Sequence, residues 1–348
     1  MESTIGTSGS QDTDAATSQG KESSVQWLDL LYGHTELQES EGAEADLHKH
    51  RSNCTKNPGH VDFIPVAAFN LQHLPDGHRD QDLLDVIKAE ADLTVRVDVK
   101  LTSPQRQEFW PDSKAPYPYF DLRGSTCTRV GSGRIREIVS YNNGRSQYGD
   151  MHELNVTSCT CRRCQGSSTP KIVWWEIVIW TARHVVYDEA EADHTSFRLF
   201  YDEDNCPEVI LDKVTLGQVF QKEDWSLLRC VTCDDILAAT LCSMIERCNE
   251  LRDKVYTKYR RTRDEDKLAF IVSHPHGCPK QITIGRWMAK IREDDSHSFI
   301  TKFTYNVSTC PGSSGAQVNI LGYSWKWVDH VHSGALSGLN YSATGLVK

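Results

Sequence analysis

The pattern of apolar and polar positions separates a polar N-terminal part of the chain from a longer part rich in strand signals. Residues 1–58 consist mostly of Ser, Thr, Gly, Asp, Glu and Gln. Such a composition buries too little surface to offset the entropy of ordering, so we expect a disordered, acidic and polar tail. Its one apolar stretch, Val25–Tyr32, is interpreted as a short transient helix, with a docking peptide as the alternative.

A mixed segment follows at residues 59–115. Leu83, Leu84, Ile87 and Ala91 share one face of a helix predicted over Asp80–Leu93. Strict alternation over Thr94–Val99 predicts a half-buried strand. We expect an N-terminal extension here, which either adds to a β-barrel or forms a small cap.

Strand signals dominate residues 116–233, which we interpret as a first β-barrel. Ile172–Trp180 is an almost continuous apolar strand, and Tyr141-Asn142-Asn143-Gly144 is a hairpin-turn signal. Shorter strand patterns in residues 266–348 predict a second barrel. They lie at Leu268–Val272, Gln281–Ile284, Phe299–Tyr305, Val318–Leu321 and Trp327–Val331.

One long helix is predicted between the two barrels, at residues 234–265. Asp234 and Asp235 suit its N-terminus, and basic side chains gather at its C-terminal end. Its apolar stripe has alternating spacings of four and three: Leu237, Leu241, Met244, Cys248, Leu251, Val255 and Tyr259. We expect this stripe to pack across the barrel seam, with self-association through residues 234–263 as the alternative.

Candidate catalytic chemistry lies in three segments. Gly312-Ser313-Ser314-Gly315 places a serine on a glycine-flanked turn, where backbone N–H groups can converge on one point. Upstream, His184 follows the apolar strand, and Asp224 precedes a strand-like run. The order His, Asp, Ser is that of one of the known serine hydrolase triads.

These segments resemble trypsin-like serine peptidases of the double β-barrel fold, closest to the HtrA-like and glutamyl-endopeptidase-like types. The matching motifs are Thr181–His184, Asp224–Leu228, Gly312–Gly315, the turn in Phe270–Gly277 and the strand His330–Gly334. The resemblance implies an all-β double barrel carrying a serine endopeptidase. Its implied triad is His184, Asp224 and Ser314, with an oxyanion hole formed by the N–H groups of Gly312 and Ser314.

Two departures from the family pattern bear on activity. Ser313 stands where zymogen enzymes carry an aspartate, so activation through a newly cut N-terminus is not expected. Ala316 and Gln317 replace the more usual Gly-Pro. The alternative function is therefore a catalytically inactive peptidase fold that binds protein partners.

The resemblance also assigns a substrate pocket to Ser308, His332, Ser333 and Gly334. Ser308 is neutral where trypsin-like pockets carry an aspartate, which argues against basic substrates. His332 falls where glutamyl endopeptidases place a histidine. An imidazole beside a hydroxyl can accept a carboxylate. Acidic preference and a medium apolar pocket remain nearly equal alternatives.

Cys159, Cys161 and Cys164 form a C-x-C-x-x-C cluster that suits a structural zinc ion. The candidates for a fourth ligand are Cys127, Cys206 and His152. Cys230 and Cys233 are interpreted as residues of a strand, and His274 and His276 as residues of a loop, so none of the four is assigned as a metal ligand. The proposed catalysis itself requires no cofactor.

The composition limits the classes of molecule that we expect the protein to bind. The formal net charge of −10 argues against nucleic acid, which needs a basic face. Nothing approaches a membrane span, and Met1–Thr4 does not open a secretory signal. With twelve cysteines read as reduced thiols, we expect a cytoplasmic protein whose partner is a protein or peptide substrate.

Overall fold

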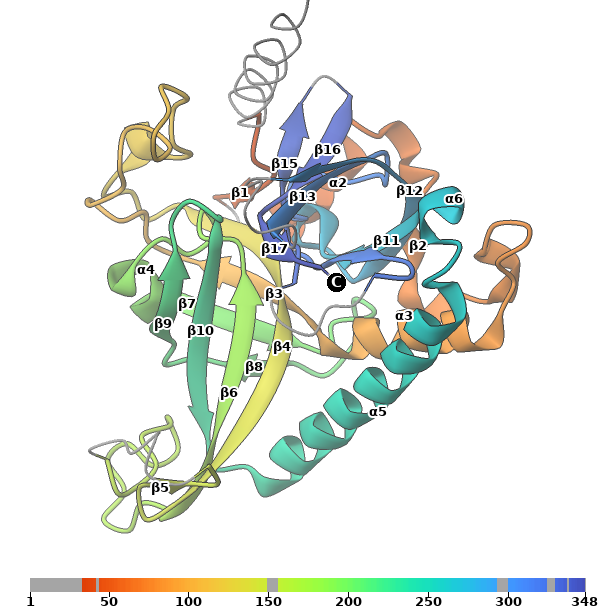
Figure 1. Ribbon diagram of the computed structural model, residues 1–348. Coiled ribbons are helices and arrows are strands. Elements are labelled where there is room, and N and C mark those ends of the chain that lie inside the picture. The colour runs from red at the N-terminus through yellow and green to blue at the C-terminus, as the bar shows by residue number, and fades with distance from the viewer. Residues whose placement is uncertain are drawn as a thin grey trace, which may run out of the picture.

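The computed structural model describes residues 33–41, 44–148, 156–292, 300–323, 329–336 and 338–347. Two antiparallel sheets make up most of it, and the long helix α5 (Asp235–Tyr259) runs from the lower end of the first sheet towards the second (Figure 1). The predicted all-β architecture with a helix between two β units is confirmed. The expectations for Val25–Tyr32 and His152 lie outside the described residues.

The first sheet has the order β8-β7-β3-β4-β6-β10-β9, with β1 and β5 also paired to β4. Its strands are β1 (Gln38–Ser40), β3 (Thr94–Val99), β4 (Thr128–Asn142), β5 (Arg145–Ser146), β6 (Val173–Thr181), β7 (Thr195–Leu199), β8 (Val209–Leu211), β9 (Thr215–Phe220) and β10 (Trp225–Thr232). Asn143 and Gly144 both have positive φ between β4 and β5, as the predicted hairpin turn requires.

Of the two roles open to residues 59–115, the structure favours addition to the first β unit, because β3 pairs with β4 and β7. The disorder expected for residues 1–58 is wrong for their described part, which contains β1, paired to β4, and a helix α2 (Glu44–Ser52). Local composition missed this order because the partners of β1 are distant in the sequence.

The helices join the two sheets. α3 (Gln81–Leu93) begins at the N-cap Asp80 and packs against α5, whose N-cap is Asp234. Shorter elements are α4 (Glu189–Asp193), α6 (Arg263–Asp266), η1 (Pro58–His60), η2 (Val66–Ala68), η3 (Leu71–His73), η4 (Phe120–Leu122) and η6 (Pro275–Gly277). Within the described ranges, no helix combines the length and apolar character needed to cross a bilayer.

A buried charge cluster fixes the seam under α5. The Glu90 carboxylate of α3 accepts from Arg134 of β4 and Arg252 of α5. Leu241, Cys248 and other members of the α5 stripe are buried by the chain itself, which favours the predicted packing role. Self-association through α5 remains a prediction, and the apolar stripe that would mediate it is covered by the chain itself.

The second sheet has the order β14-β11-β12-β13-β16-β15, with β17 paired to β13 and β2 to β12. Its strands are β2 (Ile64–Pro65), β11 (Leu268–Ser273), β12 (Gln281–Arg292), β13 (Ile300–Tyr305), β14 (Val318–Ile320), β15 (His332–Leu336), β16 (Leu339–Ser342) and β17 (Gly345–Leu346). The strand expected at Trp327–Val331 begins instead at His332, and residues 324–328 are outside the described part.

Candidate active site

A buried histidine and aspartate meet at the ends of two neighbouring strands. β6 delivers His184, and Asp224 precedes β10, which is paired with β6. The Nδ1 of His184 lies 2.9 Å from Oδ2 of Asp224, and the His184 N–H donates to Oδ1 at 3.1 Å. Because Nδ1 faces the carboxylate, Nε2 is left to exchange protons with a third group.

Polar side chains from a long loop hold the histidine segment in place. Arg106 donates to the carbonyl oxygen of His184 and forms an ion pair with Glu191. The Glu191 carboxylate also accepts a hydrogen bond from Arg129. The Trp110 ring lies edge-on to the imidazole, with 6.4 Å between centroids. The loop belongs to the predicted N-terminal extension, so part of that extension builds the site.

Ser314 lies on a tight loop that only glycine flanks allow. Gly312 has φ +100°, and a Cβ there would lie 2.3 Å from the His274 carbonyl oxygen. Gly315 has φ +84°, and its Cβ would lie 2.1 Å from Oγ1 of Thr181. Ser314 is therefore held where the loop, the η6 turn and the first sheet come together.

A segment of the same chain occupies the space in front of Ser314. The carbonyl oxygen of Glu36 accepts from the N–H of Gly312 at 2.7 Å and from the N–H of Ser314 at 3.2 Å. The Glu36 N–H donates to Oγ of Ser314 at 2.9 Å. Nε2 of His184 has no hydrogen-bond partner among the described residues. The two converging N–H groups are those expected to bind an oxyanion.

Backbone pairing extends on both sides of Glu36. His34 and Ala335 of β15 exchange two N–H···O bonds, each of 2.9 Å. Beyond Leu37, β1 pairs antiparallel with β4, where Gln38 lies opposite Val130. The segment around Glu36 is thus an extended peptide that adds to sheet edges on both sides of Ser314.

The Glu36 side chain fills a closed polar pocket. Nε2 of His332 lies 2.6 Å from its Oε2, and Nδ1 of His332 lies 2.6 Å from the Tyr305 hydroxyl. The ammonium of Lys56 contacts Oε1 and also reaches the Thr309 hydroxyl and the Asn340 amide oxygen. The pocket thus surrounds one carboxylate with donors.

These contacts determine the protonation states of Glu36 and His332. Burial alone would raise the pKa of Glu36, but His332 and Lys56 together lower that pKa to about 2. Burial lowers the pKa of His332, opposed by its hydrogen bond to Glu36. A neutral His332 that accepts from Tyr305 at Nδ1 donates its Nε2–H to the carboxylate.

The predicted pocket residues have different positions. His332 contacts the Glu36 carboxylate, and Ser333 Oγ donates to Oδ2 of Asp224 at 2.5 Å. Gly334 lies against the backbone of His34. The expectation for Ser308 is wrong, because its hydroxyl donates to Asp62 at a partly exposed site. Sequence reasoning also missed Glu36, Lys56 and Tyr305, since no local motif surrounds them.

The C-x-C-x-x-C cluster acquires a different fourth member from those expected. Sγ of Cys159, Cys161, Cys164 and Cys233 lie within 4.8 Å of one another, at the end of β10. Cys127 instead contacts the Ser40 carbonyl, and Cys206 lies in an exposed turn. The Cys230-x-x-Cys233 spacing was the signal in the sequence that could have identified Cys233 as the fourth member. Of these two cysteines, only Cys230 is buried within β10.

A second cluster of four potential metal-binding side chains lies beside the loop that carries Ser314. It comprises Cys54, His60, His276 and Cys310, with all ligand atoms within 4.8 Å. The interpretation of His276 as a simple loop residue is therefore incomplete. His274, its neighbour, stacks on Tyr201 and faces the Cys278 carbonyl. No spacing in the sequence links the four members.

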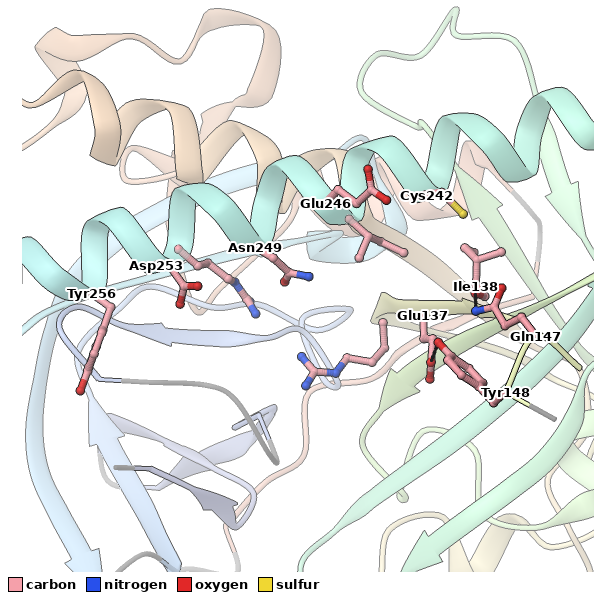
Figure 2. A pocket seen from close by; sticks show the side chains of 12 residues that line it. Glu137, Ile138, Gln147, Tyr148, Cys242, Glu246, Asn249, Asp253 and Tyr256 are labelled. Atoms are coloured by element: carbon pink, nitrogen blue, oxygen red, sulfur yellow. Dashed lines mark hydrogen bonds between the residues drawn. The ribbon is translucent and has the colours of Figure 1, made fainter. Parts of the chain in front are cut away.

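A separate groove of about 750 Å³ runs between α5 and the β4–β5 hairpin. Figure 2 shows Glu246, Asn249 and Asp253 along the helix, with Glu137 and Tyr148 on the hairpin side. None of the candidate catalytic residues lines it. The groove is thus no part of the site around Ser314.

Comparisons with known proteins give distant structural likenesses. No family model and no curated protein matches the chain. An active-form structure of the Rv3671c protease from M. tuberculosis has 12% identity and a TM-score of 0.37, covering 76% of this chain and 82% of that one. The HtrA-type protease AlgW with tripeptide has 12% identity and a TM-score of 0.36, covering 74% and 58%. An inactive form of Rv3671c has 11% identity and a TM-score of 0.35, covering 76% and 90%.

Proposed function

We propose that this protein is a serine endopeptidase that cleaves peptide bonds after glutamate. The observation that carries the proposal is the position of Glu36. Its carbonyl oxygen receives two N–H groups beside Ser314 while its carboxylate receives His332. Backbone position and side-chain recognition thus agree on a single residue of an extended peptide.

In the proposed reaction, Ser314 Oγ attacks the carbonyl carbon of the substrate glutamate, and its proton passes to Nε2 of His184. The N–H groups of Gly312 and Ser314 stabilise the developing oxyanion. His184 then gives the proton to the leaving amine. Water resolves the resulting ester by the same route in reverse. Asp224 holds the imidazole tautomer, and the Ser333 hydroxyl orients Asp224.

Specificity follows from the donors around the carboxylate. A basic side chain would meet the Lys56 ammonium and the donor face of His332, which is braced by Tyr305, so its charge would be opposed rather than paired. An apolar side chain would leave these donors without partners, which is costly in a buried site. Between the two preferences expected from sequence, the contacts of Glu36 favour the acidic one.

The test uses matched fluorogenic peptides based on His-Thr-Glu-Leu-Gln, with Glu or Gln at the central position. Wild-type protein should cleave the Glu peptide between Glu and Leu, and Ser314→Ala should not. The Gln peptide should be cut far more slowly. Equal turnover by wild type and Ser314→Ala would refute the proposal, and so would preferred cleavage after Phe or Arg.

An inactive peptidase fold is the second candidate. The observation in its favour is that Oγ of Ser314 accepts from Glu36 and Nε2 of His184 is unpartnered. Catalytic hydrogen bonds are often formed only in the reacting complex, so this geometry does not exclude catalysis. A fluorophosphonate probe separates the two functions, because only an activated Ser314 becomes labelled.

We also propose a structural zinc ion at Cys159, Cys161, Cys164 and Cys233, in a cytoplasmic protein. Four thiolates within reach of one point suit tetrahedral zinc. All twelve cysteines are free thiols, as a reducing compartment requires. The ion would fix the loop after β5 to the start of α5, away from the reacting groups.

A further inference from the structure

We infer that the chain cleaves its own Glu36–Leu37 bond. The inference rests on the proposed function and adds its first substrate. Segment 33–41 is bound to Ser314, β15 and β4 of the same molecule. Its carboxylate lies in the pocket that defines the proposed specificity. Ser314, the two oxyanion donors and the specificity pocket thus already surround Glu36 within one chain.

The step balances within the chain and one water molecule. Oγ of Ser314 bonds to the Glu36 carbonyl carbon, and its proton moves to His184. The bond to the Leu37 nitrogen breaks, and His184 protonates that nitrogen. Water then attacks the Glu36–Ser314 ester, giving a Glu36 carboxylate and restoring the Ser314 hydroxyl. The products are residues 1–36 and residues 37–348.

Cleavage at this bond leaves the pocket whole. Lys56, which contacts the Glu36 carboxylate, belongs to the larger product and stays on the pocket. β1 also remains paired with β4. Departure of residues 1–36 therefore opens the cleft to other substrates and retains the donors that recognise glutamate. The N-terminal segment acts as an internal first substrate that covers the site until it is cut.

The test follows the full chain by intact mass and N-terminal sequencing. Wild type should yield an N-terminus at Leu37, whereas Ser314→Ala and Glu36→Arg should stay intact. Glu39→Gln changes an exposed neighbour and should be cut like wild type. In a cell-free synthesis, the half-time should not change on dilution, because the segment lies in its own cleft. Intact wild type, or a half-time that lengthens in proportion to dilution, would overturn self-cleavage.

A trans peptide assay separates this failure from failure of the proposed function. Glu36→Arg puts a cation against Lys56 and His332, which displaces the segment and frees the cleft. Intact wild type together with a Glu36→Arg protein that cleaves the Glu peptide would overturn self-cleavage alone. Intact wild type with no peptide cleavage by either protein would overturn both.

An independent observation assigns a second metal site, at Cys54, His60, His276 and Cys310. Sγ of Cys54 and Cys310 are 3.6 Å apart, and Nε2 of His60 and His276 are 3.1 Å apart. Sγ of Cys310 lies 3.5 Å from Nε2 of His60. These are the separations of ligands around one tetrahedral zinc ion, and the sulfurs are too far apart for a disulfide.

The surrounding donors also suit a metal site. Asn57 donates its side-chain amide to Sγ of Cys310 at 3.1 Å and its N–H to Sγ of Cys54 at 3.4 Å. Nδ1 of His276 lies 2.8 Å from the Gln38 side-chain oxygen, which leaves Nε2 as the ligand atom. Such contacts stabilise thiolates and orient imidazoles at metal centres. The ion would connect the loop that carries Lys56 to the loop that carries Ser314.

Elemental analysis of the full chain tests both metal sites together. Protein purified under reducing conditions should hold about two zinc ions, one for each tetrahedral set. Cys54→Ser and Cys161→Ser should each lose one, and the double variant should lose both. Cobalt substitution should give a weaker thiolate charge-transfer band in Cys161→Ser than in Cys54→Ser. A metal content unchanged by Cys54→Ser, or a Cys54–Cys310 disulfide after alkylation, would overturn the second site.

Discussion

The cleft has two walls of different origin. One consists of the nucleophile loop and β15, which carry Ser314 and His332. The other is the N-terminal segment, which was expected to be disordered and from which Lys56 completes the pocket that Glu36 fills. The first wall carries short motifs with fixed chemistry. The second is placed by contacts with residues distant in the sequence, such as the Lys56–Asn340 hydrogen bond.

This difference shows what each wall does in the proposed enzyme. The first wall performs the reaction and supplies one recognition residue, His332, so its catalytic side chains should control the rate. The second wall presents one glutamate and holds a cation over it, so its side chains should control selectivity and access. Substitutions on the two walls should therefore separate in size and in the kinetic constant that they change.

The largest effects are expected for the catalytic groups. Ser314→Ala, His184→Ala and Asp224→Asn should each lower kcat by on the order of ten-thousandfold or more, because the triad acts as a unit. Kinetics on the Glu peptide measure this loss. Ser308→Ala is the matched control, because Ser308 is a partly exposed serine just before the same loop, and its circular dichroism and activity should stay near wild type. A similar loss in Ser308→Ala would show that loop geometry alone was disturbed.

The next effect concerns selectivity at His332. His332→Gln removes the braced Nε2–H donor and should lower kcat/KM for the Glu peptide by on the order of a hundredfold, as expected for a buried hydrogen bond to a charged group. The Gln peptide should change much less. An equal loss on both peptides would mean that His332 supports the fold and does not recognise the carboxylate.

A smaller loss is expected for the second wall. Lys56 is partly exposed, so Lys56→Met should lower kcat/KM for the Glu peptide by on the order of tenfold, mainly through KM. Lys49→Met, in the exposed part of α2, is the matched control. If Lys56→Met behaves like Lys49→Met, the N-terminal segment contributes no recognition.

The smallest effect is a pH-dependent difference in stability. In the Ser314→Ala chain, which stays intact, the folded-state pKa of Glu36 is about 2 against 4.5 in the unfolded chain. The carboxylate therefore stabilises the fold above pH 4.5, and this stabilisation of about 3 kcal/mol is lost as the pH falls towards 2. Denaturation of Ser314→Ala with and without Glu36→Gln should show the gap narrowing as pH falls.

His332 does not cancel in that comparison, because the Glu36 carboxylate raises the His332 pKa that burial lowers, and Glu36→Gln removes this contact. A lower His332 pKa destabilises the Glu36→Gln chain further as the pH falls below 6.5, so the narrowing assigned to Glu36 is measured below pH 4.5. A gap that does not narrow between pH 4.5 and pH 3 would contradict the charge assigned to Glu36.

Much of the first wall could be predicted from sequence, because its function needs particular residues at short spacing. Gly312 and Gly315 are required by positive φ and close approach. His184 follows one apolar strand and Asp224 precedes another, and the patterns of both strands are local. The start of the long helix followed in the same way from its stripe and from the Asp234 cap, whereas its end lies at Tyr259, before the expected residues 263–265.

The second wall could not be predicted in this way. Glu36 is one acidic residue in a polar stretch, and only its contact with His332 distinguishes it. Ser308 was misassigned because counting along the loop does not show which way a side chain turns. The pairing of Cys54 and His60 with Cys310 depends on tertiary folding, whereas Cys159, Cys161 and Cys164 are adjacent in the sequence.

The most direct test of the central claim is covalent labelling by a peptidyl phosphonate that carries glutamate at the recognition position. The account predicts that wild-type protein is modified at Ser314, shown by mass mapping, and that the matched phenylalanine probe reacts far more slowly. Ser314→Ala should not react with either probe. Absence of labelling in chains already cut after Glu36, or equal labelling by the two probes, would contradict the account.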